Sequence, residues 1–270
     1  LQPADPAAVR PEPVLVQALE HVLAQHAEGA DYKGFVNDQL KSIRQDMTVQ
    51  HIRNEFAVRV YETHARIALE NHDASEFNMC QAQLQTLYKH GLAGAVTEFL
   101  ADRTPYFLYS SSLSDARTQL RHMSVAELHD PAVVHALAVR NAFALDNYHR
   151  FFALRAGAPN HNGYLMELLY HKVRNRALIV MGDVFRPIVP LSFITSELAF
   201  DSLAAARDFV TRAGGSVTTA AGAALSPGDD LGEAVLDCRT STLRNVHELA
   251  ATEEQQLAHL AADGGVDNDL

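Results

Sequence analysis

The strongest constraint on the fold of this chain is a run of apolar residues at helical intervals between positions 49 and 67. The run comprises Val49, Ile52, Phe56, Val60, His64 and Ile67. Spacings of three and four residues are typical of the buried face of an amphipathic helix. We therefore expect one long helix here, ending near Asn71. Its polar residues either perform chemistry, bind a partner or join neighbouring helices.

Similar apolar stripes predict helices on both sides of this one. Asp73 is an expected N-cap, and Asp130 is another, followed by Pro131 at the first helical position. Pro105 is expected to kink its helix. The expected ranges are 13–28, 34–47, 74–90, 95–109, 131–155 and 164–185. Successive helices with short turns indicate stacked pairs, an α-solenoid of the TPR-like kind. Because no internal sequence repeat is evident, a helix bundle is the alternative.

The pattern changes after Arg186. Two short helices, over 187–200 and 202–215, precede two predicted strands, over 216–220 and 234–238. Helix, turn, helix and hairpin in this order predict a winged helix, so the expected fold is mostly α. A further helix is expected from Leu243 to Ala262. The expected domains are a linker with a flanking helix (1–30), a helical-repeat half (31–186), a winged helix with the C-terminal helix (187–262) and a tail (263–270).

Composition excludes several classes of protein. No apolar run approaches the roughly 18 residues of a membrane span. The two cysteines, Cys80 and Cys238, form no CxxC motif and indicate a reducing compartment. The chain begins at Leu1 with a proline-rich stretch rather than a signal peptide, so we interpret it as a fragment whose own N-terminus is missing.

Motifs for catalysis or metal binding are missing from the sequence. It contains no GxSxG, GxxxxGK[ST] or GxGxxG motif. None of the 14 His residues has a second His three or four positions away, as a helical zinc pair requires. We therefore expect no catalytic residue, no metal and no cofactor, and the chain is not expected to be an enzyme.

Basic residues from position 172 onward are candidates for contacts with nucleic acid. They are Lys172, Arg174, Arg176, Arg186, Arg207, Arg212, Arg239 and Arg244. Arg207 and Arg212 lie on the second helix of the predicted winged helix, where they could face phosphate. A solvated helix face explains them equally well. The net charge of −11 and the acidic loop at 228–233 oppose nucleic-acid binding by the chain alone.

One long motif carries a family resemblance. The stretch from Asp38 to Tyr88, "DQLKSIRQDMTVQHIRNEFAVRVYETHARIALENHDASEFNMCQAQLQTLY", resembles the signature of the GANP-type family (germinal-centre-associated nuclear protein), whose members contain PCI domains. The segments "YHKVRNRAL", "FRPIVPLSFITSELAF" and "LDCRTS" follow in the same order. The resemblance extends over about residues 31–245. It is strongest to the branch of leukocyte receptor cluster member eight homologues.

The resemblance implies a PCI domain, which is a helical-repeat half joined to a winged helix. It implies a non-enzymatic nuclear scaffold that pairs with a second PCI protein, and that partner binds a small acidic subunit of the DSS/Sem type. The two winged helices together would bind RNA or DNA without sequence specificity, in transcription elongation, mRNA processing or export. The alternative is a subunit of another PCI assembly, such as the proteasome lid, the signalosome or an initiation factor, without a nucleic-acid role.

The resemblance also implies structural roles for several residues. Two Arg–acid pairs, Arg44 with Asp46 and Arg53 with Glu55, are expected to join neighbouring helices. Phe193, Ile194 and Leu198 are expected to pack the winged helix onto the last solenoid helix or onto the partner. The Ala- and Gly-rich, acidic wing departs from the basic wing that direct contact with RNA requires.

Overall fold

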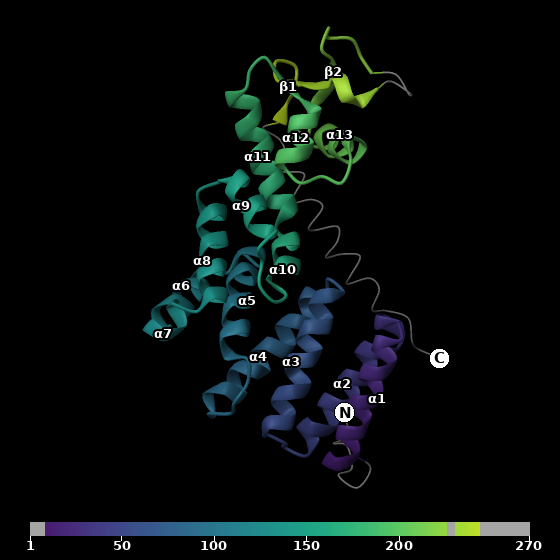
Figure 1. The fold of residues 1–270 in the computed structure, drawn as a ribbon, viewed down its shortest axis with the longest axis vertical. Helices are drawn as coiled ribbons and strands as arrows, with labels where there is room; N and C mark the ends of the chain where they lie inside the picture. The colour runs from purple at the N-terminus through teal and green to yellow at the C-terminus, as the bar shows by residue number, and fades with distance from the viewer. Residues whose placement is uncertain (1–8, 226–229, 244–270) are drawn as a thin grey trace, which may run out of the picture. The chain divides into compact units, whose positions relative to one another are not determined.

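The computed structural model describes residues 9–225 and 230–243, and these residues are mostly helical (Figure 1). They form two compact units. The first contains residues up to 140 together with 158–168, and the second contains 141–157 together with the described residues from 169 onward. The predicted predominance of helix is confirmed. None of the helices in the described ranges combines the length and the apolar composition that a membrane span requires.

The first unit is built from helices packed around one large core and a smaller apolar cluster. Its elements are α1 (Glu12–Ala27), a π-helical turn η1 (Tyr32–Val36), α2 (Asn37–Val49), α3 (Glu55–Glu70), α4 (Ala74–Lys89), α5 (Val96–Tyr109), α6 (Leu113–His122), α7 (Val125–Leu128), the first ten residues of α8 (Pro131–Ala144) and α10 (Asn162–Leu168). Helices α3 and α4 pack against each other most extensively. Their buried apolar residues form the centre of the core, with Phe77 the largest fully buried side chain.

Local capping signals in the sequence are confirmed. The Asp73 carboxylate accepts a hydrogen bond from the backbone N–H of Glu76 (2.9 Å), at the start of α4. The Asp130 carboxylate accepts one from Ala132 (2.9 Å), at the start of α8. Each side chain satisfies a backbone donor that the first helical turn leaves free. Pro105 lies inside α5, as expected.

Three expected helices are shorter than the apolar stripes indicated. Val49 ends α2, and the next helix begins only at Glu55, because His51 adopts a left-handed conformation (φ 55°) and Asn54 caps α3. Asp146 (φ 50°) breaks the helix expected over 131–155 in the same way, so that α9 is separate. The helix expected over 164–185 is likewise divided into α10 and α11, at Leu169.

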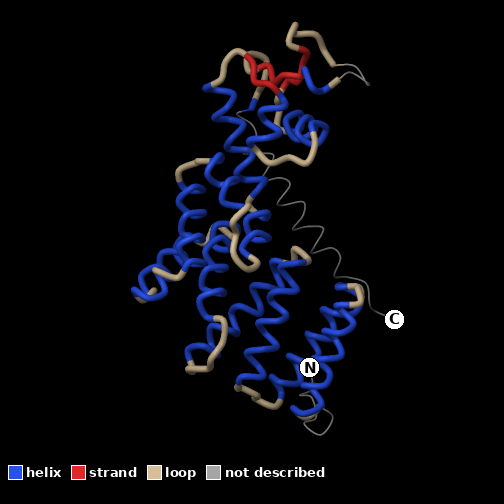
Figure 2. The backbone as a smooth tube through the Cα atoms, in the orientation of Figure 1, coloured by secondary structure: helices blue, strands red, loops and turns tan. Residues whose placement is uncertain are grey.

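The second unit combines helices with a small antiparallel sheet, drawn in red in Figure 2. Its elements are the end of α8, α9 (Tyr148–Arg155), α11 (Tyr170–Val184), β1 (Ile188–Pro190), α12 (Leu191–Glu197), α13 (Leu203–Arg212), β2 (Ser216–Thr219), a 3-10 turn η2 (Leu231–Glu233) and β3 (Ala234–Asp237). Strand β3 is central, and both Ile188 of β1 and Ser216 of β2 lie opposite Asp237.

The two strands and the capped helix expected from the sequence are confirmed in this unit. The Ser202 hydroxyl accepts a hydrogen bond from Ala205 (3.1 Å) and caps α13, which is followed by Gly214 at φ 82°. Strand β1 was not expected. The C-terminal helix and the tail expected beyond residue 243 lie outside the described residues. The expected domain boundaries stay predictions.

Candidate functional site

Two of the candidate arginines, Arg186 and Arg239, line the same pocket of the second unit. The pocket has a volume of about 380 Å³ and lies between the C-terminal end of α11 and the segment that follows β3. Both arginines are exposed. Arg186 forms a loose ion pair with Asp183 (3.5 Å). Such exposed pairs contribute little to stability, so the guanidinium is available to other anions.

Backbone hydrogen bonds fix the segment that carries Arg239. The N–H of Cys238 donates to the carbonyl of Pro187 (3.0 Å), and the N–H of Thr242 donates to that of Gly214 (2.9 Å). The carboxylate of Asp237 accepts hydrogen bonds from the backbone N–H of Arg239 and the hydroxyl of Thr240, and these lower its pKa. The segment after β3 is therefore held beside the end of α11.

The two arginines of α13 lie on its outer side. Arg207 donates from Nε (2.9 Å) and Nη2 (2.7 Å) to one oxygen of its neighbour Asp208. Arg212 makes one long hydrogen bond to the carbonyl of Asp208 (3.4 Å). Asp208 therefore neutralises part of the charge that was expected to face phosphate.

Arg174 and Arg176 make contacts within the second unit instead. Arg174 donates to the carbonyls of Leu198 (2.9 Å) and Ala199 (2.5 Å), at the end of α12. Its guanidinium lies 4.0 Å from the ring centre of Phe200, and burial lowers its pKa. Arg176 pairs with Asp146 (3.2 Å). These contacts stabilise the fold of the unit and occupy both side chains.

The remaining candidates of this unit have varied surroundings. Lys172 is half-buried on α11, and Arg244 lies outside the described residues. Ile194 and Leu198 are fully buried in the core of the unit. Phe193 is half-buried, with its ring 5.7 Å from that of Phe185.

Neither of the expected Arg–acid pairs forms an ion pair in the described structure. Arg44 of α2 contacts Glu76 (2.5 Å) and the sulfur of Cys80 (3.1 Å), both on α4, rather than Asp46. Asp46 instead pairs with Arg10 (2.6 Å). Arg53 and Glu55 are exposed, and neither has an ion pair among the residues that the structure describes. Arg44 therefore joins two helices, whereas Arg53 is solvated.

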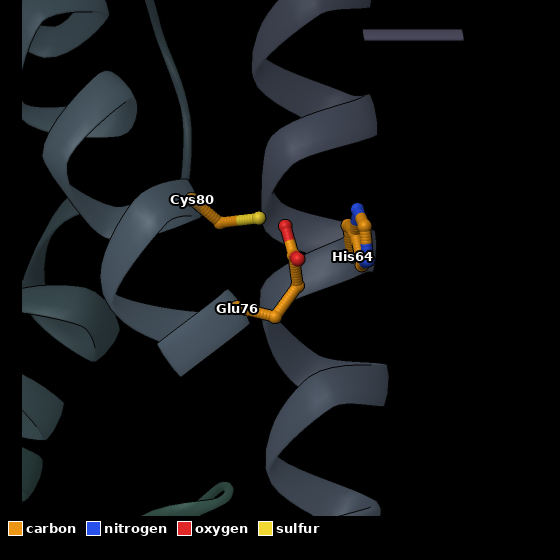
Figure 3. A group of neighbouring side chains, drawn as sticks. All are labelled: His64, Glu76 and Cys80. Atoms are coloured by element: carbon orange, nitrogen blue, oxygen red, sulfur yellow. The ribbon is translucent and has the colours of Figure 1, made fainter. Parts of the chain in front are cut away.

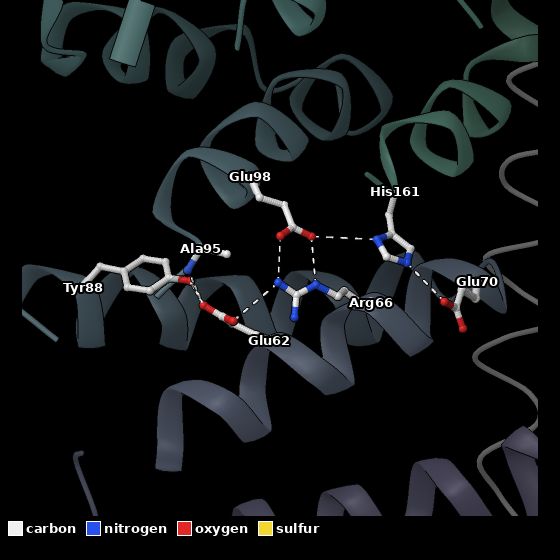
Figure 4. Close-up of polar contacts among 7 residues, drawn as sticks. All are labelled: Glu62, Arg66, Glu70, Tyr88, Ala95, Glu98 and His161. Carbon is white, nitrogen blue, oxygen red and sulfur yellow. Dashed lines mark hydrogen bonds and ion pairs between the residues drawn. The ribbon is translucent and has the colours of Figure 1, made fainter. Parts of the chain in front are cut away.

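A network of polar side chains, drawn in Figure 4, joins α3, α4, α5 and the segment before α10. Arg66 binds Glu98 through two parallel hydrogen bonds (2.9 and 2.7 Å) and lies 3.4 Å from Glu62. Glu62 also accepts hydrogen bonds from the Tyr88 hydroxyl (2.7 Å) and the backbone N–H of Ala95 (2.6 Å). One guanidinium thus compensates two carboxylates that are largely buried.

His161 continues this network from the segment before α10. It binds Glu70 (3.1 Å) through Nε2 and lies 3.8 Å from Glu98 through Nδ1. The interaction with Glu98 raises the pKa of His161. Burial alone would raise the pKa of Glu98, but its hydrogen bonds with Arg66 and the interaction with the nearby His161 outweigh burial and hold that pKa at about 2. No sequence pattern indicates this site, because its members come from segments far apart.

Asp102 lies beside the network and is fully buried. It accepts one hydrogen bond, from the amide of Asn162 (3.3 Å), and its second oxygen has no partner in the described structure. Burial, together with the nearby charge of Glu98, raises the pKa of Asp102 to about 7. This carboxyl group is therefore partly protonated at neutral pH.

Comparison with known proteins places the chain in a family. Residues 2–219 match the model of the SAC3/GANP family. The chain belongs to the SAC3/GANP family. The resemblance inferred from the long motif is therefore confirmed. The matched range includes Arg186, Arg207 and Arg212 but ends before Arg239.

Three curated relatives are similar to this SAC3/GANP-family chain. A leukocyte receptor cluster member 8 homolog from Xenopus laevis is 51% identical over 196 residues, which are 73% of this chain and 24% of the relative. A THP3 homolog from Schizosaccharomyces pombe is 45% identical over 199 residues, which are 74% of this chain and 50% of the relative. SAC3 family protein A from Arabidopsis thaliana is 44% identical over 201 residues, which are 74% of this chain and 20% of the relative. The chain thus spans half or less of their lengths.

One group in this SAC3/GANP-family chain has the donor atoms of a metal site. His64, Glu76 and Cys80 place their ligand atoms within 4.8 Å of one another (Figure 3). However, Arg44 contacts both Glu76 and Cys80, and Lys41 pairs with Glu76 (3.1 Å). A metal ion would have to displace these cations, and burial raises the pKa of the Cys80 thiol to about 12. These donor atoms therefore do not fit a metal ion. The sequence had not led us to expect Cys80 and His64 close together.

Proposed function

We propose that this chain is a non-enzymatic scaffold subunit that pairs with a second PCI protein in nuclear mRNA biogenesis. Membership of the SAC3/GANP family supports this function, together with the mRNA role that the family resemblance implies. The paired proteins would form a platform that binds RNA or DNA. A small acidic subunit of the DSS/Sem type would join through the partner.

The order of elements supports a PCI domain. The successive helices of the first unit, joined by short turns, suit an α-solenoid. In the second unit, α12 and α13 precede the antiparallel hairpin of β2 and β3, to which β1 adds a third strand. One strand, two helices and then a hairpin that pairs with the first strand correspond to a winged helix, with the second helix, α13, in the position that usually contacts nucleic acid.

The observation that carries the nucleic-acid part is the grouping of Arg186 and Arg239 around one open pocket. Their guanidinium groups have no close carboxylate partner in the described residues other than the loose contact of Arg186 with Asp183. Phosphate oxygens bind such groups well, without reading base sequence. Because the net charge is −11, the partner has to supply the remaining positive charge.

An apolar surface beside β1 suits a protein partner. Val180, Val184, Phe185 and Ile188 are between 38% and 68% exposed. They lie at the end of α11 and on β1, which is an edge strand of the described sheet. Apolar side chains beside an unpaired strand edge are typical of interaction surfaces.

The pairing is tested by affinity purification of the tagged chain from nuclear extract after nuclease treatment, followed by mass spectrometry. One PCI protein and one small acidic subunit in near-equal amounts are expected. Recovery of proteasome or signalosome subunits would instead place the chain in another PCI assembly.

Nucleic-acid binding is then measured on the assembled complex, by anisotropy of labelled single-stranded RNA at several salt concentrations. Replacing Arg186 and Arg239 with Glu should weaken binding and reduce the salt slope by about 1.4, since each lost phosphate contact accounts for about 0.7. The matched control replaces Arg117 and Arg121, two exposed arginines of α6, with Glu. It should leave both the RNA affinity and the salt slope unchanged. Equal affinity of the two variants would refute the role of the pocket.

A further inference from the structure

Arg103, on α5 of the first unit, is a half-buried guanidinium without an acceptor. Its Nε is buried and has no hydrogen-bond partner, and the side chain forms no ion pair within the described structure. Its guanidinium lies over the ring of Phe107, 5.1 Å from the ring centre. Burial lowers the pKa of Arg103. By contrast, the half-buried Arg66 binds Glu98 through two hydrogen bonds.

Arg103 lines a pocket that is formed by the first unit alone. The pocket has a volume of about 330 Å³ and lies among α4, α5 and the segment from α6 to α7. Its apolar wall includes Leu100, Phe107 and Met123. This volume is within the range of pockets that hold small ligands.

A second unsatisfied group, Gln119 of α6, lies in the same wall. Its side-chain amide donates to the carbonyl of Leu100 (2.6 Å), which fixes which end of the amide carries the oxygen. That oxygen is buried and has no donor in the described structure, and the residue is only 8% exposed. One pocket is therefore lined by an unsatisfied donor, Arg103, and an unsatisfied acceptor, Gln119. Leaving either without a hydrogen-bond partner costs stability.

The charges around the pocket favour a carboxylate ligand. Lys89 is exposed at the wall and forms no ion pair with any described residue. Of the two acidic residues, Glu127 is already engaged, because it accepts hydrogen bonds from the N–H and hydroxyl of Ser124 (both 2.7 Å). Asp115 influences Arg103 only through its charge. Neither acid forms an ion pair with Arg103 or Lys89 in the described structure, so both cations can bind a ligand.

We propose that this pocket binds a short acidic peptide segment of a partner protein. A carboxylate of the peptide binds Arg103 and Lys89, a backbone N–H donates to the oxygen of Gln119, and a neighbouring apolar side chain packs on Phe107 and Met123. A phosphate group would satisfy Arg103 but offers Gln119 no strong donor, which favours a peptide. The site is in the first unit and does not depend on nucleic-acid binding.

The test uses the full 270-residue chain and an array of hexapeptides. Each peptide carries two Glu or Asp residues beside one apolar residue. Each also has a counterpart in which Gln or Asn replaces the two acidic residues. Binding of hits is then measured by anisotropy. We expect a subset of acidic peptides to bind at least about tenfold more tightly than their amide counterparts, as a hydrogen bond to a charged group predicts. The inference is overturned if no acidic peptide exceeds its counterpart.

Variants separate this pocket from other basic surfaces. Arg103→Met keeps an apolar stem beside Phe107 and should weaken peptide binding about tenfold or more. Lys89→Ala changes an exposed residue and should also weaken it. Arg117→Met, an exposed arginine of α6 outside the pocket, is the matched control and should bind normally. Equal binding by Arg103→Met, Lys89→Ala and the control would refute the site.

A stability measurement gives an independent readout. Because Arg103 lacks an acceptor, Arg103→Met should leave the melting temperature of the peptide-free chain unchanged or higher, while it weakens binding. If Arg103 had only a structural role, the substitution would lower the melting temperature and leave peptide binding unchanged. A lower melting temperature together with normal peptide binding would overturn the proposal.

Discussion

The Arg66 network allows a quantitative prediction for the substitution Arg66→Met. The side chain of Arg66 is 30% exposed, whereas those of Glu62 and Glu98 are 12% and 14% exposed. Met preserves much of the volume but leaves two carboxylates that are largely buried without their cation. Removal of one partner from a buried pair costs about 3–5 kcal/mol, and partial solvation of Arg66 reduces this to about 2–3 kcal/mol.

The cost should depend on pH in a defined direction. In the native chain the pKa of Glu98 is held at about 2, below its ordinary value of 4.5. The stabilisation from Arg66 is therefore complete above pH 4.5 and is lost as the pH falls toward 2. Without Arg66 that pKa rises, so the difference in unfolding free energy between the variant and the native chain should shrink by about 0.5–1 kcal/mol at pH 4.

Urea unfolding followed by circular dichroism at pH 7.5 and pH 4 measures both quantities. Arg59→Met is the matched control, since Arg59 is an exposed arginine of the same helix, and its effect should stay within about 0.5 kcal/mol. Adding Glu98→Gln to Arg66→Met should recover part of the loss. The reasoning would be refuted if Arg66→Met lowered the unfolding free energy no more than Arg59→Met does. It would also be refuted if the loss caused by Arg66→Met were the same at both pH values.

Three further predictions follow from particular contacts. Asp102→Asn should stabilise the chain by about 1–3 kcal/mol at pH 8 and have little effect at pH 4. The pKa of Asp102 is raised to about 7, so its ionisation in the folded state costs stability as the pH rises. Equal unfolding free energies of the variant and the native chain at pH 8 would contradict this. Arg174→Met should lower stability by about 2 kcal/mol without changing RNA affinity, since its donors are used by the end of α12; anisotropy and urea unfolding of the same sample check both. Gly94→Ala should cost about 1–3 kcal/mol, because the added carbon would meet Glu62 and Tyr88, whereas Gly157→Ala, with open space, is the control; thermal unfolding distinguishes them.

Local features of the fold could be predicted because they depend on neighbours in the sequence. Asp73 and Asp130 act as caps through donors only two or three residues away. The helix breaks at His51 and Asp146 could not be predicted, since a left-handed conformation of a non-glycine residue persists only where the surrounding packing stabilises it. Strand β1 is three residues long, ends in Pro190 and depends on pairing with β3, far along the chain.

The candidate sites show the same limit. The candidate arginines could be found in the sequence, but sequence spacing could not distinguish Arg174, whose donors are used within the protein, from Arg186, which lines an open pocket. Arg44 was expected beside Asp46, yet its partner Glu76 lies on another helix. The unsatisfied Arg103 gave no signal, because a missing acceptor becomes evident only when every neighbour is known.

The path of the chain between the two units has a consequence for its biosynthesis. Residues 141–157 belong to the second unit, 158–168 return to the first, and the chain then leaves it again. On the ribosome, the first unit therefore cannot close when α8 emerges, because α10, which supplies Leu165 to its core and Asn162 to Asp102, is translated later. Truncations that end before residue 168 should expose apolar surface and recruit chaperones, and nascent chains should become resistant to protease only after that point.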